Sequence, residues 1–244
     1  VIKMNIFFLL FIGTALLMLL GNGVVASCVL KGTKASGSGW MVITTAWAFA
    51  VFVGVTVAAP VSGAHLNPAV TLALAVKGGI SWGLLPIYFA GEFLGAAFGA
   101  FLVWLMFRDH FAMTEDNGAK QACFCTSPAI RRTSSNLMSE IIGTFVLMYT
   151  ILHFADGSAN IAGEIAPIGL GTLGGLNVAI LVWVIGLSLG STTGYAINPA
   201  RDLSPRLVMR LVQPQLNPDW QYAWIPVVGP FVGGVLAVLV SFIY

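Results

Sequence analysis

The sequence predicts an all-α integral membrane protein, with six membrane-spanning helices and two re-entrant half-helices arranged as an inverted repeat. Three observations predict this fold: charge is scarce, the uncharged segments are long enough to cross a membrane, and one short motif occurs twice. Charged residues make up 8% of the 244 residues, against about 25% in an ordinary soluble domain. Hydrophobic residues make up 58% and the mean hydropathy is +0.92, so we expect membrane lipid to surround much of the surface.

Composition also excludes several classes of function. A net charge of +2 is too small to indicate a nucleic-acid partner. The sequence Cys123-x-Cys125 has no further ligands nearby, so we expect no metal site. The chain has no glycine-rich nucleotide-binding loop, and no nucleophile–base pair lies in its apolar segments. We therefore expect neither a cofactor nor an enzymatic activity.

The positions of the charges define the spans. Uncharged residues fill the segments 4–30, 35–76, 165–200 and 220–244. A helix needs about 20 residues to cross a hydrocarbon core that is ~30 Å thick. On this basis we expect spans at 6–29, 40–60, 84–106, 137–155, 167–190 and 223–243. An even number of spans puts both termini on the same side, but basic residues occur in nearly every loop and leave the orientation open.

Two apolar pieces, 67–77 and 198–210, remain after the second and fifth spans. Each is long enough for only about half of the bilayer. Non-helical backbone at this depth persists only where it is buried in protein or lines a water-filled cavity. We therefore interpret both pieces as re-entrant half-helices.

An internal repeat divides the chain into a first unit at 1–106, a connecting loop at 107–136 and a second unit at 137–244. Three motifs recur in the same order, at offsets of 130, 131 and 138 residues. The pairs are Gly13-Thr14 with Gly143-Thr144, Asn67-Pro68-Ala69 with Asn198-Pro199-Ala200, and Gly91-x-Phe93-x-Gly95 with Gly229-x-Phe231-x-Gly233. Because each unit has three spans, the second enters the membrane from the opposite face, and the half-helices meet near the midplane.

The paired Asn-Pro-Ala motifs indicate a pore midpoint. Asn is a favoured N-cap and Pro is favoured at the first helical position, so each motif begins a half-helix. Two helix N-termini, each with roughly half a positive charge, repel a cation there but not a neutral hydrogen-bonding solute. We expect the Asn67 and Asn198 amides to donate to such a solute. Backbone carbonyls are expected to supply acceptors at Gly63, Ala64, His65, Leu66, Tyr195, Ala196 and Ile197.

The segments Ser62-Gly63-Ala64-His65-Leu66-Asn67-Pro68-Ala69-Val70 and Gly194-Tyr195-Ala196-Ile197-Asn198-Pro199-Ala200-Arg201-Asp202 resemble the aquaporin family, and specifically its glycerol-conducting branch. The resemblance covers essentially the whole chain. It implies the six-helix fold with two half-helices, a homotetramer with one pore per subunit, and a place in the cell membrane. It also implies a passive channel for glycerol and other small neutral solutes, with water permeating and ions and protons excluded.

By the same resemblance, the narrowest part of the pore is a filter of four residues, Trp47, Gly186, Tyr195 and Arg201. Water-selective members usually have His at the place of Gly186, so here the glycine leaves room. Trp47 and Tyr195 are expected to form an apolar corner that faces the Arg201 donor, and a charge between apolar segments is functional by default. Asp202, Arg206 and Pro226 also resemble positions that mark the glycerol-conducting branch.

The chain departs from the family in its supporting acids. A Glu usually lies three residues before the first Gly-Thr, where it holds backbone N–H groups behind a half-helix. Glu140 has this place in the second unit, but the first unit has Leu10. Glu92, in the third span, is the candidate substitute, and a neutral packing role is the other interpretation. Ser204 stands where glycine is commoner, which leaves the pore width open.

Two other functions remain open from the sequence. Gly186 and Asp202 disfavour a strictly water-selective channel. A coupled secondary transporter also uses inverted repeats and broken helices, and would use Glu92, Glu140 or Asp202 as its proton site. The sequence does not rank glycerol against urea, dihydroxyacetone or small protonated acids such as lactic acid.

Overall fold

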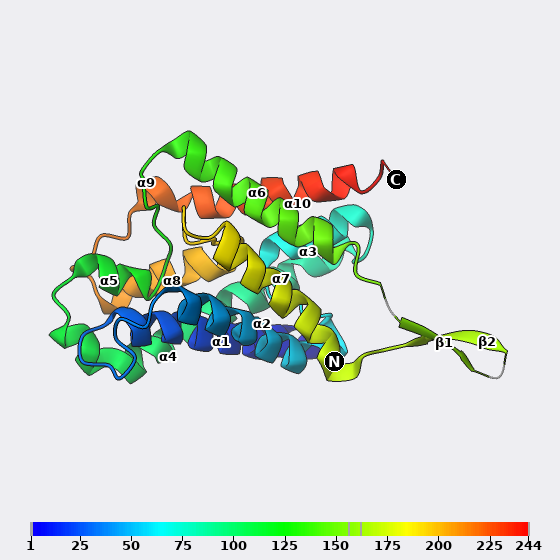
Figure 1. The fold of residues 1–244 in the computed structure, drawn as a ribbon, viewed down its shortest axis with the longest axis horizontal. Coiled ribbons are helices and arrows are strands. Elements are labelled where there is room, and N and C mark those ends of the chain that lie inside the picture. Colours follow the sequence, from blue (N-terminus) through cyan, green and yellow to red (C-terminus); the bar gives the residue numbers. More distant parts are fainter. Residues whose placement is uncertain (1, 156, 162, 244) are drawn as a thin grey trace.

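The computed structural model describes residues 2–155, 157–161 and 163–243. In these residues six long helices and two half-helices form one bundle (Figure 1). The long helices are α1 (Ile2–Val29), α2 (Trp40–Ser62), α4 (Leu85–Met113), α6 (Thr133–Ile151), α7 (Gly175–Ser188) and α10 (Ile225–Val240). The half-helices are α3 (Pro68–Lys77) and α8 (Pro199–Val212). The predicted set of six spans and two half-helices is confirmed.

Within the described part of the chain, five helical stretches are long and apolar enough to cross a membrane. Three of them include a short leading turn, namely η1 (Trp82–Leu84), η2 (Gly171–Gly174) and α9 (Trp220–Ala223). The remaining long helix, α6, has 19 residues. Its first turn is polar, Thr133-Ser134-Ser135-Asn136, which lowers its mean hydropathy although its length suits a span.

The fifth predicted span, 167–190, is wrong at its start. Its first two residues belong to a two-stranded antiparallel hairpin, β1 (Gly157–Ile161) and β2 (Glu164–Ile168), in which Gly157 pairs with Ile168. The hairpin extends from the end of the bundle that also carries both termini (Figure 1). Three glycines, at 169, 171 and 174, lie between it and α7, and a fourth, Gly175, is the first residue of α7. Because each glycine disfavours helix by about 1 kcal/mol relative to alanine, the α-helix begins only at the last of these glycines.

Part of the predicted connecting loop 107–136 is helical. Helix α4 continues to Met113, a short helix α5 spans Asn117–Ala122, and α6 begins at Thr133. The Asp116 side chain caps α5 by accepting hydrogen bonds from the Gly118 and Ala119 backbone N–H groups, at 2.8 and 3.1 Å. The division into units at 1–106 and 137–244 stays a prediction, and its outermost residues, 1 and 244, lie outside the described residues.

Each unit contains an equivalent crossing of two long helices, and a glycine at each crossing lets the two helices approach closely. In the first unit α1 packs on α4, and in the second α6 packs on α10. A Cβ atom on Gly91 would lie 2.9 Å from the Leu10 Cβ, and one on Gly229 would lie 2.6 Å from the Glu140 Cβ. Leu10 and Glu140 therefore occupy matching places at matching crossings. Each half-helix also contacts a long helix of the other unit, α3 on α10 and α8 on α4.

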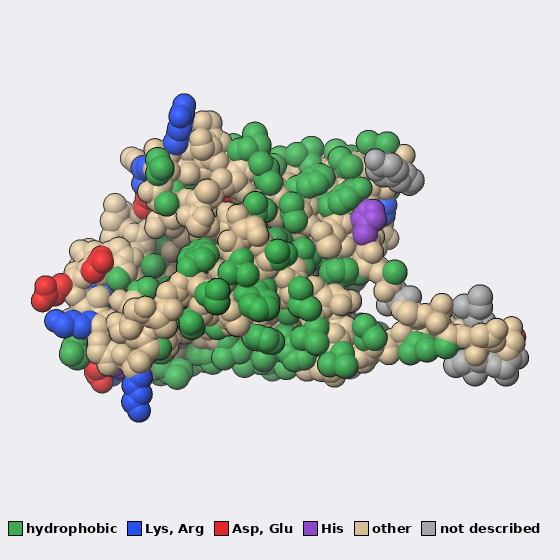
Figure 2. All heavy atoms as spheres, in the orientation of Figure 1, with side chains coloured by type: hydrophobic (Ala, Val, Ile, Leu, Met, Phe, Trp, Pro, Cys, Tyr) green, Lys and Arg blue, Asp and Glu red, His purple; other side chains and the backbone are tan. Residues whose placement is uncertain are grey.

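Apolar side chains form the outer surface of the bundle. Figure 2 shows hydrophobic side chains over the middle of the molecule, whereas most of the visible acidic and basic side chains gather at the end with α5 and α9. Large apolar side chains are about half exposed on several helices, among them Phe8, Phe49, Leu94 and Val184. Such a surface is stable against lipid and not against water.

Candidate pore

Both half-helices begin as the Asn-Pro-Ala motifs predict. Asn67 and Asn198 are extended N-caps, with φ of −157° and −154°, and a proline takes the first turn of each helix. The Asn67 side-chain oxygen accepts from the Ala69 N–H at 2.9 Å. The Asn198 oxygen accepts from the N–H groups of Ala200 and Arg201, at 3.0 and 3.2 Å. Each cap thus fixes the orientation of its own amide.

The two motifs meet through a reciprocal pair of hydrogen bonds. The Asn67 Nδ2 donates to the Ile197 carbonyl at 2.7 Å, and the Asn198 Nδ2 donates to the Leu66 carbonyl at 2.8 Å. The Leu66 and Ile197 carbonyls therefore join the two loops, a role that the sequence did not indicate. An amide nitrogen carries two hydrogens, so each Asn keeps one N–H for a solute.

Left-handed backbone is repeated in the two loops that lead to the motifs. In the first loop φ is positive at Gly63 (70°), Ala64 (51°) and Leu66 (52°), and in the second at the residues with the same spacing, Gly194 (84°), Tyr195 (35°) and Ile197 (41°). A non-glycine residue pays roughly 1–2 kcal/mol for this conformation. An extended strand would turn successive carbonyls to opposite sides, and the left-handed residues break that alternation.

Two buried acids hold these loops from behind. Glu140 accepts from the Thr193 hydroxyl at 2.7 Å and from the N–H groups of Ala196 and Ile197 at 3.1 and 2.8 Å. Glu92 accepts from the Asn67 N–H at 3.1 Å and from the Thr71 hydroxyl at 2.7 Å. The acid therefore comes from α6 in the second unit but from α4 in the first, where Leu10 has the place that matches Glu140.

The four predicted filter residues lie together. The Arg201 Cζ lies 4.4 Å from the centroid of the Trp47 ring, which is a cation–π distance. A Cβ atom on Gly186 would lie 2.9 Å from the Tyr195 Cζ. The room beside Gly186 is therefore filled by the Tyr195 ring, and the expectation that the glycine itself leaves space for a solute needs this correction. Arg201 Nη1 has no hydrogen-bond partner among the described residues.

Trp40 supports the filter and was missed. Its Nε1 donates to the Gly186 carbonyl at 3.0 Å, and its ring packs edge-on against Tyr195 at a centroid distance of 5.8 Å. The sequence offered only the position of Trp40 at the start of a span, where tryptophan is common for interfacial reasons.

A cavity of about 150 Å³ connects these features. Its wall includes Gly63 and His65 of the first loop, both Asn caps, and the filter residues Trp47, Tyr195 and Arg201. The apolar part of the wall comes from long helices and from α3, at Leu17, Val51, Val55, Val70, Leu74, Leu147, Ile151, Val178 and Val182. The wall of the cavity thus combines hydrogen-bonding groups with apolar side chains. Ser204 is buried on α8 and is absent from the described wall.

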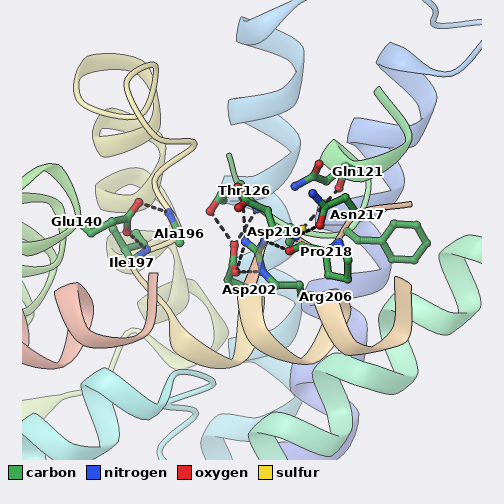
Figure 3. Close-up of polar contacts among 12 residues, drawn as sticks. Gln121, Thr126, Glu140, Ala196, Ile197, Asp202, Arg206, Asn217, Pro218 and Asp219 are labelled. Atoms are coloured by element: carbon green, nitrogen blue, oxygen red, sulfur yellow. Dashed lines mark hydrogen bonds and ion pairs between the residues drawn. The ribbon is translucent and has the colours of Figure 1, made fainter. Parts of the chain in front are cut away.

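Asp202 and Arg206, both on α8, form a fully buried ion pair (Figure 3). Asp202 accepts from the Thr126 N–H and hydroxyl at 2.7 and 2.6 Å, and from Arg206 Nε at 2.9 Å. Arg206 also donates to the carbonyls of Pro218 and Thr126, at 2.5 and 2.9 Å. Half-helix α8 is thereby tied to the segments 123–132 and 213–219, and Thr126 and Pro218 were not foreseen from the sequence.

Outside the spans, Arg131 and Asp219 form a bidentate ion pair with two hydrogen bonds of 2.7 Å. These hydrogen bonds from Arg131 lower the pKa of the Asp219 carboxyl below its usual 3.8. Nearby, burial raises the pKa of the Cys125 thiol to about 12. Among the described residues no three His, Cys, Asp or Glu side chains gather as a metal site would need.

Comparison with known proteins agrees with this geometry. The family model described as "Major intrinsic protein" matches residues 5–241. The glycerol uptake facilitator protein of Streptococcus pneumoniae (strain R6) is 52% identical over 240 residues, which cover 97% of this chain and 98% of that protein. The probable glycerol uptake facilitator protein of Thermotoga maritima is 46% identical over 235 residues, with 96% of each chain covered.

A solved structure supports the same assignment. The X-ray structure of the aquaglyceroporin from Plasmodium falciparum superposes with a TM-score of 0.82 at 32% identity, covering 97% of this chain and 94% of that one. The D/L-lactic acid transporter of Lactiplantibacillus plantarum is also similar, at 38% identity over 233 residues, which cover 93% of this chain and 92% of that protein. The chain belongs to the major intrinsic protein family, the aquaporins, and is a multi-pass protein of the cell membrane.

Proposed function

We propose that this protein is a passive channel through which glycerol and other small neutral solutes cross the cell membrane, with water also permeating. One observation carries the proposal: a single cavity joins the two Asn caps to Trp47 and Arg201. Relatives that are 46–52% identical over nearly the whole chain are named glycerol uptake facilitators, which supports glycerol as the solute.

The wall of the cavity, which combines hydrogen-bonding groups with apolar side chains, suits glycerol. A glycerol molecule has hydroxyls along one edge and carbon–hydrogen groups along the other. The Trp47 and Tyr195 rings offer an apolar surface to the carbon edge, while Arg201 Nη1 is a donor without a partner among the described residues. Past the filter, the free N–H of each Asn amide and the loop carbonyls continue the hydrogen-bonding side. A solute with hydroxyls thus exchanges water for protein partners along the path.

Ion exclusion follows from fixed positive charge. Both half-helices direct their N-termini at the cavity, and each contributes roughly half a positive charge. Arg201 adds a full charge 4.4 Å from the Trp47 ring. A cation would lose its water shell in a narrow, partly apolar passage against this potential, whereas a neutral solute would not.

The decisive experiment uses the full chain in proteoliposomes and follows light scattering after an osmotic jump. We expect fast, non-saturating entry of glycerol, slow entry of sorbitol, and no ion current across the same membranes. Empty liposomes give the background permeability. Water flux with glycerol excluded would instead identify a water-selective channel. Saturable uptake that a protonophore abolishes would identify a coupled transporter.

The family resemblance extends the proposal to a homotetramer with one pore per subunit, embedded in membrane lipid. An apolar groove between α1, α2 and α4 supports it, since exposed Met41, Val42 and Phe49 line this groove. Mass measurement of the detergent-solubilised protein by light scattering tests the oligomeric state. A mass of one subunit would refute the tetramer and leave the channel proposal standing.

A further inference from the structure

His65 belongs to the cavity wall, but only one of its ring nitrogens faces the cavity. Its Nδ1 lies 3.0 Å from the Thr71 hydroxyl oxygen, and its ring packs against Tyr88 at a centroid distance of 4.7 Å. The Nε2 has no hydrogen bond to any described residue and lies on the side of Gly63, where a Cβ atom would approach it to 3.6 Å. Since Gly63 and the partly exposed His65 both line the cavity, Nε2 is the nitrogen that a solute meets.

The direction of the hydrogen bonds behind His65 can be deduced from Glu92. The Asn67 backbone N–H, which can only donate, points at Glu92 Oε1 over 3.1 Å. A carbonyl or carboxylate oxygen accepts such a bond better than a carboxylic hydroxyl does, so we take Oε1 as the oxygen without a proton. The Thr71 hydroxyl lies 2.7 Å from the same oxygen and has a single hydrogen. That hydrogen goes to the carboxyl oxygen, which is both the nearer and the stronger acceptor.

The Thr71 oxygen is then left with its lone pairs toward His65. We propose that Glu92, acting through Thr71, holds the neutral His65 imidazole as the Nδ1–H tautomer, so that Nε2 is a hydrogen-bond acceptor facing the pore. A neutral imidazole has one donor and one acceptor nitrogen, and the partner of one nitrogen fixes the other. Thr71 and Glu92 are positioning residues for a solute-facing acceptor.

The chemical consequence concerns the part of the pore that the first loop lines, from Gly63 to the Asn pair. There the loop carbonyls are acceptors, and Nε2 adds a side-chain acceptor to them. This stretch therefore recognises solute O–H or N–H donors. A solute that moves along it toward the centre meets its first protein hydrogen-bond donors at the Asn67 and Asn198 amides. This consequence rests on the proposed function, whereas the tautomer itself does not.

The second unit lacks this arrangement. The residues that match His65, Thr71 and Glu92 by the repeat offsets are Ala196, Asp202 and Pro230. Glu140 instead has donors on both carboxyl oxygens, while Glu92 Oε2 has none among the described residues. The chain of three side chains is thus a feature of one half of the pore and not a requirement of the repeated scaffold.

Histidine nitrogen NMR on the full-length protein in liposomes tests the tautomer. At pH 8 the ring is neutral, and long-range proton–nitrogen correlations tell which ring nitrogen is protonated. His65→Gln identifies the His65 signals among those of His110 and His153. We expect protonated Nδ1 at His65 in the natural protein and in Thr71→Ser, which keeps the hydroxyl. In Thr71→Val, which removes it, we expect a mixture of tautomers.

Glycerol permeability supplies the second readout. Loss of one oriented hydrogen bond predicts a decrease of about 2- to 10-fold in Thr71→Val, with recovery in Thr71→Ser. A natural protein with protonated Nε2 at His65 would overturn the proposal, and this spectrum decides even where Thr71→Val does not fold. An unchanged tautomer in folded Thr71→Val would also overturn it. If the natural protein passes no glycerol, the proposed function fails while the tautomer assignment stands.

Discussion

The buried pair of Asp202 and Arg206 gives the sharpest prediction, through Asp202→Asn. Each Asp202 oxygen accepts two hydrogen bonds, from Thr126 on one side and from Arg206 on the other. An Asn has one oxygen, so its NH₂ group must face either the Thr126 N–H or the guanidinium, donor against donor. Arg206 is also left without its counter-charge in a place where both side chains are fully buried.

The cost follows from that geometry. Removing one partner of a buried ion pair costs about 3–5 kcal/mol, because the other charge stays buried and unpaired. We therefore expect Asp202→Asn to lower the free energy of unfolding by about this amount, measured by denaturant titration of the purified protein. Asp219→Asn is the matched control, since it makes the same chemical change in an ion pair at the surface, where the Arg131 side chain is 56% exposed and the Asp219 side chain 16%, so that solvent partly screens the charges.

The free energies of unfolding of the two variants are to be compared. Asp202→Asn should be much less stable than Asp219→Asn. It should also conduct glycerol poorly, because α8 begins at the Asn198 cap and carries Arg201. Equal stabilities of Asp202→Asn and Asp219→Asn would refute the reasoning. A double variant, Asp202→Leu with Arg206→Met, should recover part of the loss, because it removes both buried charges together.

Three further predictions concern the filter, the supporting acid and pH. Gly186→Ala places a Cβ 2.9 Å from the Tyr195 ring, so stopped-flow scattering should show glycerol entry reduced more than water entry; equal reductions would contradict this. Glu92→Leu leaves the Asn67 N–H and the Thr71 hydroxyl without their acceptor, so the free energy of unfolding should fall by about 1–3 kcal/mol, and adding Leu10→Glu should restore part of it in the same titration. Because the pKa of Asp219 is lowered below 3.8 by Arg131, its contribution to stability is present above 3.8 and is lost as the pH falls through the lowered pKa. Melting curves of the natural protein should therefore converge on those of Asp219→Asn in strong acid, and a constant difference would argue against the ion pair.

Features that depend on local sequence preferences could be predicted from the sequence. The Asn-Pro-Ala starts of α3 and α8 follow from capping and proline preferences, and the uncharged segments define the long helices. The grouping of Trp47, Gly186, Tyr195 and Arg201 came from the family resemblance and not from their spacing. No pattern within 40–60 or 167–190 shows that these residues meet.

Contacts between distant segments could not be predicted. Thr126 and Pro218 reach Arg206 through backbone groups, which leave no mark in the sequence. The second strand of the hairpin was missed because its last residues, 165–168, are as apolar as the start of a span, and the glycines that follow at 169, 171 and 174 mark the break before α7. Thr71 was a detectable clue that was missed, as a hydroxyl among the apolar residues 68–76 of the half-helix.

Two equivalent hydrogen bonds join the two units at the centre of the molecule, one from Asn67 to Ile197 and one from Asn198 to Leu66. Neither unit can form its hydrogen bond alone, because the acceptor carbonyl belongs to the other unit. A protein with only one such half would have to pair with a second copy, turned upside down, before any passage existed. Fusing the two halves into one chain makes this pairing intramolecular, and it also allows each side to change alone, as the acids at Glu92 and Glu140 have done.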